Sequence, residues 1–219
     1  PLLQLCVYAV VFSIILRNDI EQYYLFLFVA LVPWIFFSTS VSGGASVIWS
    51  QQDMVKKIYF PRQVLPITFV TSQFVNMFLS FLVVFFVLII SGKGISIVAL
   101  MYMPIIMIVE YILCLGMAFI TSALTVYLRD LEYLSSIITM AWQFLTPVMY
   151  SIDTVPEQLL PLFNVNPMTP IIIAYRDILY YKTVPQLGTL PHGTILGVFL
   201  LIVGWKLFDK LQKRFAEVM

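Results

Sequence analysis

Charged side chains are scarce in this chain of 219 residues. Only 11% of the residues are charged, against roughly 25% in an average soluble domain, and 61% are hydrophobic. A soluble fold of this composition would expose large apolar patches and aggregate, because surface-to-volume geometry limits how much a domain of this size can bury. The composition therefore predicts an integral membrane protein.

Histidine, cysteine and nucleotide-binding motifs are equally scarce. His192 is the single histidine, and Cys6 and Cys114 both lie in apolar runs, where we interpret them as small core residues. Neither a metal-binding cluster nor a Ser/His/Asp catalytic set can be assembled, and the motif G-x-x-x-x-G-K-[ST] is absent. We therefore expect no metal site, cofactor or catalytic activity in this chain itself. The net charge of +1 gives no indication of a nucleic-acid partner.

Eight long charge-free runs occupy most of the chain, and several exceed the roughly 20 apolar residues that a helix needs to cross a bilayer. Their side chains do not alternate in polarity, which excludes a membrane β-barrel. The predicted fold class is all-α and integral to the membrane, as a single transmembrane domain over residues 1–219. The stretch 96–128 is too long for one perpendicular helix, so it must tilt, break at Pro104 or project into water. Six transmembrane helices are expected, at residues 1–16, 23–49, 63–90, 96–128, 133–150 and 194–208.

The run 158–175 is also free of charge, but its prolines and asparagines argue against a transmembrane helix. Prolines at this density interrupt a continuous helix. We expect one or two short helices that dip into the membrane edge from outside, where irregular backbone must be covered by protein or line a cavity. This external re-entrant segment supplies the candidate site residues Pro161, Asn166, Pro167, Pro170, Tyr175 and Arg176.

Lysine and arginine are distributed unequally between the two ends of the six expected helices. Eight of the twelve basic residues would lie on one side of the membrane and four on the other. By the positive-inside rule the richer side is cytoplasmic, which places both termini inside and residues 151–193 outside.

Three cytoplasmic segments have a recognisable pattern. Residues 51–62 (QQDMVKKIYFPR) form a short amphipathic loop, and Arg129 and Asp130 form a tight charged turn between the fourth and fifth helices. The tail at 206–219 repeats apolar residues at helical spacing. We interpret the tail as an interfacial helix end, with a docking site as the alternative.

Glu110 is the candidate for an ionisable group inside the membrane. A carboxylate in hydrocarbon costs several kcal/mol unless it is paired or protonated, so its presence would indicate a functional role. Alternatively, Glu110 precedes Arg129 by 19 residues, about 28 Å along a helix, which would place it at the outer interface. Both interpretations stay open at this point.

Three stretches of the sequence carry a family pattern. The first is VKKIYFPR at 55–62 followed by Leu65 and Pro66, and the second is VYLRDL at 126–131. The third is FLTPVMY at 144–150, followed by NPMT at 166–169 and by Tyr175 and Arg176. In this order and spacing they resemble the membrane subunit of type-2 ABC exporters, which move polysaccharides or polyol phosphates, and the resemblance covers essentially the whole chain.

The resemblance implies a homodimer with a path between its two copies, both termini inside, in the bacterial cytoplasmic membrane. A separate ATPase subunit would bind ATP and Mg²⁺, and a lipid-linked glycan (O-antigen, capsule or teichoic acid) would be moved outwards. The family's amphipathic N-terminal interface helix has no counterpart here, so we expect it to be missing from this chain. The loop would be the coupling helix that docks on the ATPase, through Gln51, Asp53, Lys56, Lys57, Ile58, Tyr59, Phe60 and Arg62.

Aromatic residues make up 16% of the chain. Most would face lipid or form interfacial belts, but aromatic faces also bind sugar rings. Candidates for a glycan path are Tyr8, Phe12, Trp34, Trp142 and Tyr150.

Two other functions fit the same sequence. An ABC exporter of a drug or lipid would share the fold and differ only in cargo. A standalone channel or secondary transporter would need an ion or proton relay within the membrane, for which Glu110 is the only plausible anchor.

Overall fold

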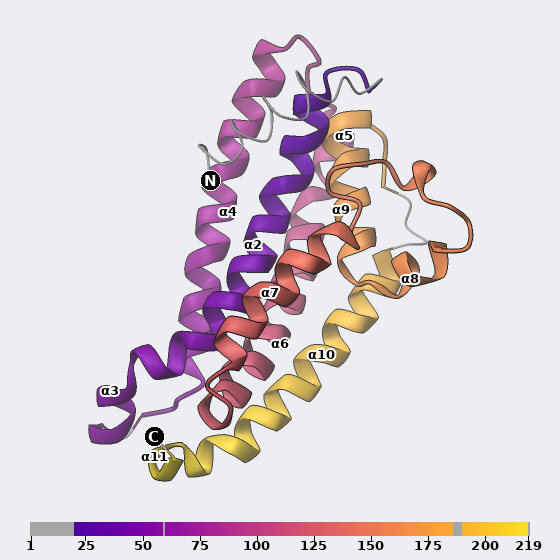
Figure 1. Ribbon diagram of the computed structural model, residues 1–219. Coiled ribbons are helices and arrows are strands. Elements are labelled where there is room, and N and C mark those ends of the chain that lie inside the picture. The colour runs from indigo at the N-terminus through magenta and orange to yellow at the C-terminus, as the bar shows by residue number, and fades with distance from the viewer. Residues whose placement is uncertain (1–19, 59, 186–189, 219) are drawn as a thin grey trace.

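The computed structural model describes residues 20–58, 60–185 and 190–218. Every regular element in these ranges is helical, which confirms the predicted all-α class for this part of the chain. Four long helices run along the molecule, and a shorter one lies against them (Figure 1). They are α2 (Tyr23–Ser50), α4 (Val64–Ile90), α6 (Met103–Tyr127), α10 (Leu190–Leu211) and the shorter α7 (Leu131–Phe144).

Three helices in the described ranges are long and apolar enough to cross a membrane. They are Tyr23–Ser50, Val64–Ile90 and Ile97–Tyr127, the last of which joins α5 (Ile97–Leu100) to α6. These match the expected helices at 23–49, 63–90 and 96–128 within one residue at each end. A turn at Met101 and Tyr102 separates α5 from α6, and Pro104 lies in the first turn of α6, so the long run is interrupted beside Pro104. The expected helix at 1–16 falls outside the described residues.

The fifth and sixth expected helices have different limits. α7 ends at Phe144, so the predicted helix over 133–150 is wrong in its C-terminal part. Pro147 explains the early end, since proline lacks an N–H and disfavours helical backbone at Thr146. In contrast, α10 begins four residues before and ends three residues after the expected 194–208.

Two short helices form between α7 and α10, as the prolines indicated. α8 (Leu160–Val165) carries Pro161 in its first turn, and α9 (Met168–Arg176) begins directly after Pro167. A π-helical turn, η3 (Asp177–Tyr181), follows α9, and a single 3-10 turn, η2 (Ile152–Thr154), precedes α8. The interrupted backbone confirms that this segment is not one continuous helix.

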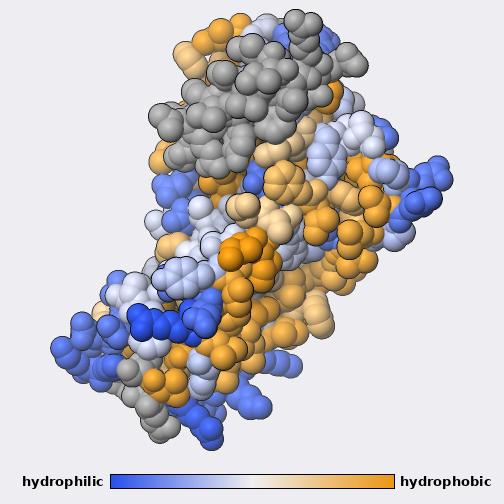
Figure 2. Space-filling view, in the orientation of Figure 1, coloured by the Kyte–Doolittle hydropathy of each residue, from blue (hydrophilic) through white to orange (hydrophobic). Residues whose placement is uncertain are grey.

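The long helices differ in how far their neighbours cover them. α2 lies between α4, α6 and α7, and most of its side chains are buried. α4 instead leaves a row of large apolar side chains, such as Phe78, Leu82 and Phe86, at least half exposed. Figure 2 shows orange apolar side chains over much of the middle of the molecule. A surface of this kind requires lipid or another chain to cover it.

Glycine brings α6 and α10 into direct backbone contact. A Cβ atom on Gly116 would lie 2.6 Å from the backbone nitrogen of Leu201, and one on Gly204 would lie 2.5 Å from the carbonyl oxygen of Gly116. Small residues allow helices in membranes to approach this closely, which lets dispersion contacts hold them together. α6 and α10 therefore form one tightly packed pair.

Candidate functional site

A short cationic helix connects α2 to α4 at one end of the molecule (Figure 1). This helix, α3 (Gln52–Lys57), follows Gln51 and ends at Ile58, whose backbone is extended. Asp53 and Lys57 form an exposed ion pair, with 3.6 Å between Nζ and Oδ1. Such a pair stabilises the helix only slightly, because water surrounds it.

The two faces of α3 differ in exposure. Val55 is buried and belongs to the same apolar cluster as Phe208 and Phe215, near the C-terminus. Lys56 and Lys57 point to water, and Ile58 is 58% exposed. The predicted coupling loop thus exposes two lysines and an isoleucine, while Val55 on the opposite face holds α3 against the rest of the protein. Tyr59 lies outside the described residues.

The loop after α3 contacts the C-terminal tail. Phe60 packs against the cluster around Val55, and an Arg62 guanidinium N–H donates to the carbonyl oxygen of Gln212. The tail consists of the end of α10, a 3-10 turn, η4 (Gln212–Arg214), and α11 (Phe215–Val218). Phe208 and Phe215 are fully buried, so the apolar face of the tail packs against the rest of the protein. The ring of Phe208 packs against Phe119 of α6 and that of Phe215 against Tyr127, and Val55 of α3 belongs to the same cluster.

The second charged turn lies at the same end of the molecule as α3. The guanidinium of Arg129 lies 5.1 Å from the ring centre of Trp49, the penultimate residue of α2. Trp49 also donates its indole N–H to the carbonyl oxygen of Thr125, at 3.0 Å. Asp130 precedes α7 without a side-chain capping bond. Trp49 therefore joins the end of α2 to the turn between α6 and α7.

Asn166 organises the external segment at the start of α9. Its side-chain amide donates to the carbonyl oxygen of Leu145 at 3.0 Å and to the hydroxyl of Thr146 at 2.8 Å. Its Oδ1 accepts from the backbone N–H of Met168 at 3.0 Å, which satisfies one free donor at the helix start. One side chain thus connects the end of α7 to α9.

Arg176 makes a second connection at the other end of α9. It is buried, and its two terminal nitrogens donate to the carbonyl oxygens of Tyr150, at 3.0 Å, and Val148, at 2.6 Å. Its guanidinium also lies 3.6 Å from the ring centre of Phe26 in α2. Burial lowers the pKa of Arg176 to about 9, so the group is still charged at neutral pH. Carbonyl dipoles and an aromatic face therefore stabilise this cation.

Glu110 is buried between α6 and α9. The hydroxyl of Tyr175 donates to its Oε2 at 2.8 Å, and the ring of Tyr175 stacks on Phe81 of α4 with centres 5.1 Å apart. Both residues are fully buried, and Oε1 of Glu110 has no hydrogen-bond partner among the described residues. Of the two interpretations, the structure supports an enclosed carboxyl group and not one exposed at an interface. No pattern in the sequence indicated that Glu110 would pair with Tyr175.

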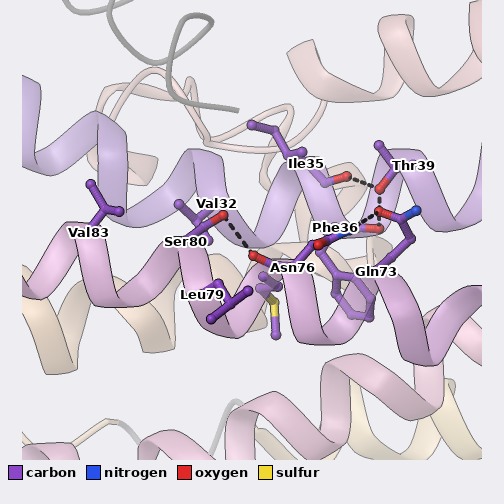
Figure 3. Close-up of a pocket in the computed structure, with 10 residues that line it drawn as sticks. Val32, Ile35, Phe36, Thr39, Gln73, Asn76, Leu79, Ser80 and Val83 are labelled. Atoms are coloured by element: carbon purple, nitrogen blue, oxygen red, sulfur yellow. Dashed lines mark hydrogen bonds between the residues drawn. The ribbon is translucent and has the colours of Figure 1, made fainter.

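A groove of about 570 Å³ runs between α2 and α4. Its walls are apolar, but Thr39 of α2 and Gln73, Asn76 and Ser80 of α4 bring uncharged polar groups into it (Figure 3). The hydroxyls of Thr39 and Ser80 donate to carbonyl oxygens of their own helices, at 2.6 and 2.8 Å. Hydroxyls bonded in this way can lie in an apolar setting at little cost and still accept a further hydrogen bond.

A second groove, of about 340 Å³, lies on the other side of α2, against α7. Uncharged polar side chains dominate its lining, and the side-chain nitrogen of Gln143 is buried with no partner among the described residues. The groove is lined by Trp34, Ile35, Ser38, Thr39, Ser42, Ser136, Thr139, Met140 and Gln143.

The aromatic candidates do not share one surface. Trp34 is buried and contacts the ring of Phe37, with centres 5.4 Å apart, and Trp142 meets the same ring edge to face, with centres 5.3 Å apart. Tyr150 lies in the loop after α7, where its hydroxyl donates to the carbonyl oxygen of Phe144 at 2.6 Å. Of these three aromatic residues, Trp34 alone lines the groove between α2 and α7. Tyr8 and Phe12 lie outside the described residues.

Metal-ligating side chains are dispersed in the part of the chain that the structure describes. No group of three or more His, Cys, Asp or Glu residues comes together there. The geometry instead offers a cationic surface at one end, a hydrogen-bonded segment towards the other, and polar grooves along α2.

The comparisons with known proteins agree with this arrangement. The ABC-2 type transporter family model matches residues 1–180. The O-antigen export system permease protein RfbA of Myxococcus xanthus is 31% identical over 219 residues, covering 99% of this chain and 84% of the relative. Two such permeases of Klebsiella pneumoniae are 32% and 30% identical, covering all of this chain and 84% of each relative. With its apolar helices, the chain is a multi-pass membrane protein, and it belongs to the ABC-2 type transporter family.

Proposed function

We propose that this chain is the permease subunit of an ATP-driven exporter that moves a lipid-linked polysaccharide of the O-antigen type across the bacterial cytoplasmic membrane. The observation that carries the proposal is α3, a cationic helix between two apolar helices that is buried on one side and presents Lys57 and Ile58 on the other. The relatives are named as O-antigen export permeases, which supports a polysaccharide of this type as the cargo.

The proposed topology has six transmembrane segments with both termini in the cytoplasm. They are residues 1–16, α2, α4, α5 with α6, α7 and α10. In support, α3, the turn at Arg129 and the C-terminal tail lie at the same end of the bundle, and this end carries most of the basic residues. α10 has 22 residues and is about 33 Å long, enough to cross the hydrocarbon region.

The proposed assembly is a homodimer bound to two ATPase subunits. A second copy would cover part of the apolar surface that α7 leaves exposed, where Ile137, Met140 and Phe144 are each more than half accessible. The ATPase subunits would close on ATP and push on α3. Because α3 shares a buried cluster with side chains of α6 and α10, a push on α3 is passed to these helices as a rigid-body movement.

The groove between α2 and α7 is the part of the surface that we assign to the glycan path. Sugars carry many hydroxyl groups, and the lining offers hydroxyls and an amide that can exchange hydrogen bonds with them as the chain moves. The unpartnered nitrogen of Gln143 would donate to a sugar hydroxyl. The indole of Trp34 adds an apolar face for a sugar ring.

The experiment that tests the proposed function combines the full-length permease with the ATPase subunit encoded beside it. We expect the two proteins to co-purify and to restore surface polysaccharide in a cell that lacks the permease. The variant Lys57→Glu with Ile58→Ser should lose both properties, because it reverses one charge and removes the exposed apolar side chain on α3.

The matched control is Lys182→Glu, which reverses an exposed lysine in the external segment. It should leave both co-purification and export unchanged. If the α3 variant kept both the complex and the export, the coupling assignment would be wrong.

A further inference from the structure

The loop after α3 and the C-terminal tail enclose a socket of about 520 Å³ on the proposed cytoplasmic side. Ile58, Phe60, Pro61 and Arg62 form one wall, and Gln212 and Lys213 form the other. We propose that this socket is part of the docking surface for the ATPase subunit, so that the tail supplies the second half of the coupling surface. This inference rests on the proposed function.

Several polar contacts fix the position of the tail wall. An Arg62 N–H donates to the carbonyl oxygen of Gln212, and the hydroxyl of Tyr127 in α6 donates to the carbonyl oxygen of Leu211 at 3.0 Å. The side-chain amide of Gln63 also lies 3.4 Å from Oδ1 of Asp209. The backbone of the tail is therefore tied to the start of α4 and to the end of α6.

Aromatic packing holds the tail from beneath. The ring of Phe208 meets Phe119 of α6 edge to face, with centres 5.3 Å apart, and it meets Phe215 at 5.5 Å. Tyr127 completes the group, with its ring centre 6.3 Å from that of Phe215. A surface built on a buried aromatic cluster is rigid, which lowers the entropy cost of binding a partner.

The chemistry of the socket fits a protein with an acidic rim and an apolar side chain at its centre. Ile58 and Pro61 are exposed and apolar, Lys213 is an exposed cation in the same lining, and Arg214, the next residue along the chain, is exposed as well. Across residues 51–62 and 212–214, five basic residues accompany one acidic residue. Lipid headgroups would pair with the cations, but they would not cover the exposed isoleucine in the wall of the socket. A protein partner matches both features.

The test measures binding of the purified ATPase subunit to full-length permease in phosphatidylcholine nanodiscs, which have no net charge. Lys213→Glu should raise the dissociation constant about fivefold, because one charge contact at the rim becomes repulsive. Lys206→Glu is the matched control, since it makes the same charge change two helical turns earlier and should bind like the wild type.

A second measurement detects direct contact between the tail and the ATPase subunit, which a charge reversal acting at long range does not report. A photo-reactive amino acid in place of Arg214 should give a covalent adduct with the ATPase subunit, and one in place of Lys206 should give none. Wild-type binding by Lys213→Glu together with no adduct at position 214 would overturn the tail assignment, provided that Lys57→Glu with Ile58→Ser still abolishes binding. If the wild-type permease does not bind the ATPase subunit, the proposed function itself fails.

Discussion

Replacing Tyr175 with phenylalanine removes one oxygen atom from an enclosed contact between the external segment and α6. The phenylalanine ring keeps the stacking on Phe81, so the change isolates the hydrogen bond to Glu110. Without this donor, neither carboxyl oxygen of Glu110 has a partner among the described residues. Leaving a buried polar group unsatisfied costs about 1–3 kcal/mol. For a chain of this length, each kcal/mol lowers the melting temperature by roughly 2–4 °C, so the expected fall is about 5 °C.

The assay is the thermal unfolding of the purified full-length protein in detergent, followed by intrinsic fluorescence. Tyr133→Phe is the matched control, because Tyr133 is 72% exposed and its loss of a hydroxyl should not change the melting temperature. Glu110→Gln keeps an acceptor for Tyr175 and should cost less than Tyr175→Phe. In a Glu110→Leu background, Tyr175→Phe should have almost no further effect, since no acceptor is left.

A melting temperature of Tyr175→Phe within about 1 °C of the wild type would refute the reasoning, because the hydrogen bond would then contribute too little. An equal cost of Tyr175→Phe in the wild-type and Glu110→Leu backgrounds would refute it as well. In that case the effect of the hydroxyl would not depend on Glu110.

Three further changes give distinct outcomes. Gly116→Ala should cost about 1–3 kcal/mol in thermal unfolding, because its methyl group would meet the backbone of α10, whereas Gly197→Ala, with ordinary contact distances, should be tolerated. Asn166→Ala should lower the free energy of unfolding by about 1 kcal/mol and speed the hydrogen exchange of the Met168 amide, since the Met168 N–H loses its acceptor. Gln143→Leu should lower the rate of polysaccharide export without lowering the melting temperature, because the side-chain nitrogen of Gln143 makes no hydrogen bond within the described ranges that the change could remove. Unchanged export in that variant would contradict the assignment of the groove.

Much of the fold could be predicted from the spacing of charges. Helices α2, α4 and α5 with α6 follow the charge-free runs because a long apolar run in a membrane satisfies its backbone only as a helix. The end of α7 was missed, since composition does not show where the chain turns to meet another element. Thr146 leaves the helix where Pro147 follows it and Asn166 binds it, and Asn166 lies 20 residues further along the chain.

The candidate site was predictable in its residues but not in its contacts. The stretches at 144–150, 166–169 and 175–176 stood out by pattern, and the structure brings them together through Asn166 and Arg176. Counting residues along the helix placed Glu110 relative to the membrane surface. It did not show which side chains of other helices surround it. Likewise, the apolar face of the tail was visible in the sequence. Its packing beside α3 depends on tertiary structure that no local pattern specifies.

The central claim is that α3 couples this permease to an ATPase that drives polysaccharide export. The most direct measurement is the ATP-dependent movement of lipid-linked polysaccharide across proteoliposomes that hold the full-length permease and its ATPase subunit. We predict transport by the wild type and by Lys182→Glu, and none by Lys57→Glu with Ile58→Ser. Transport that persists without the ATPase subunit, or that the α3 variant supports at the wild-type rate, would contradict the claim.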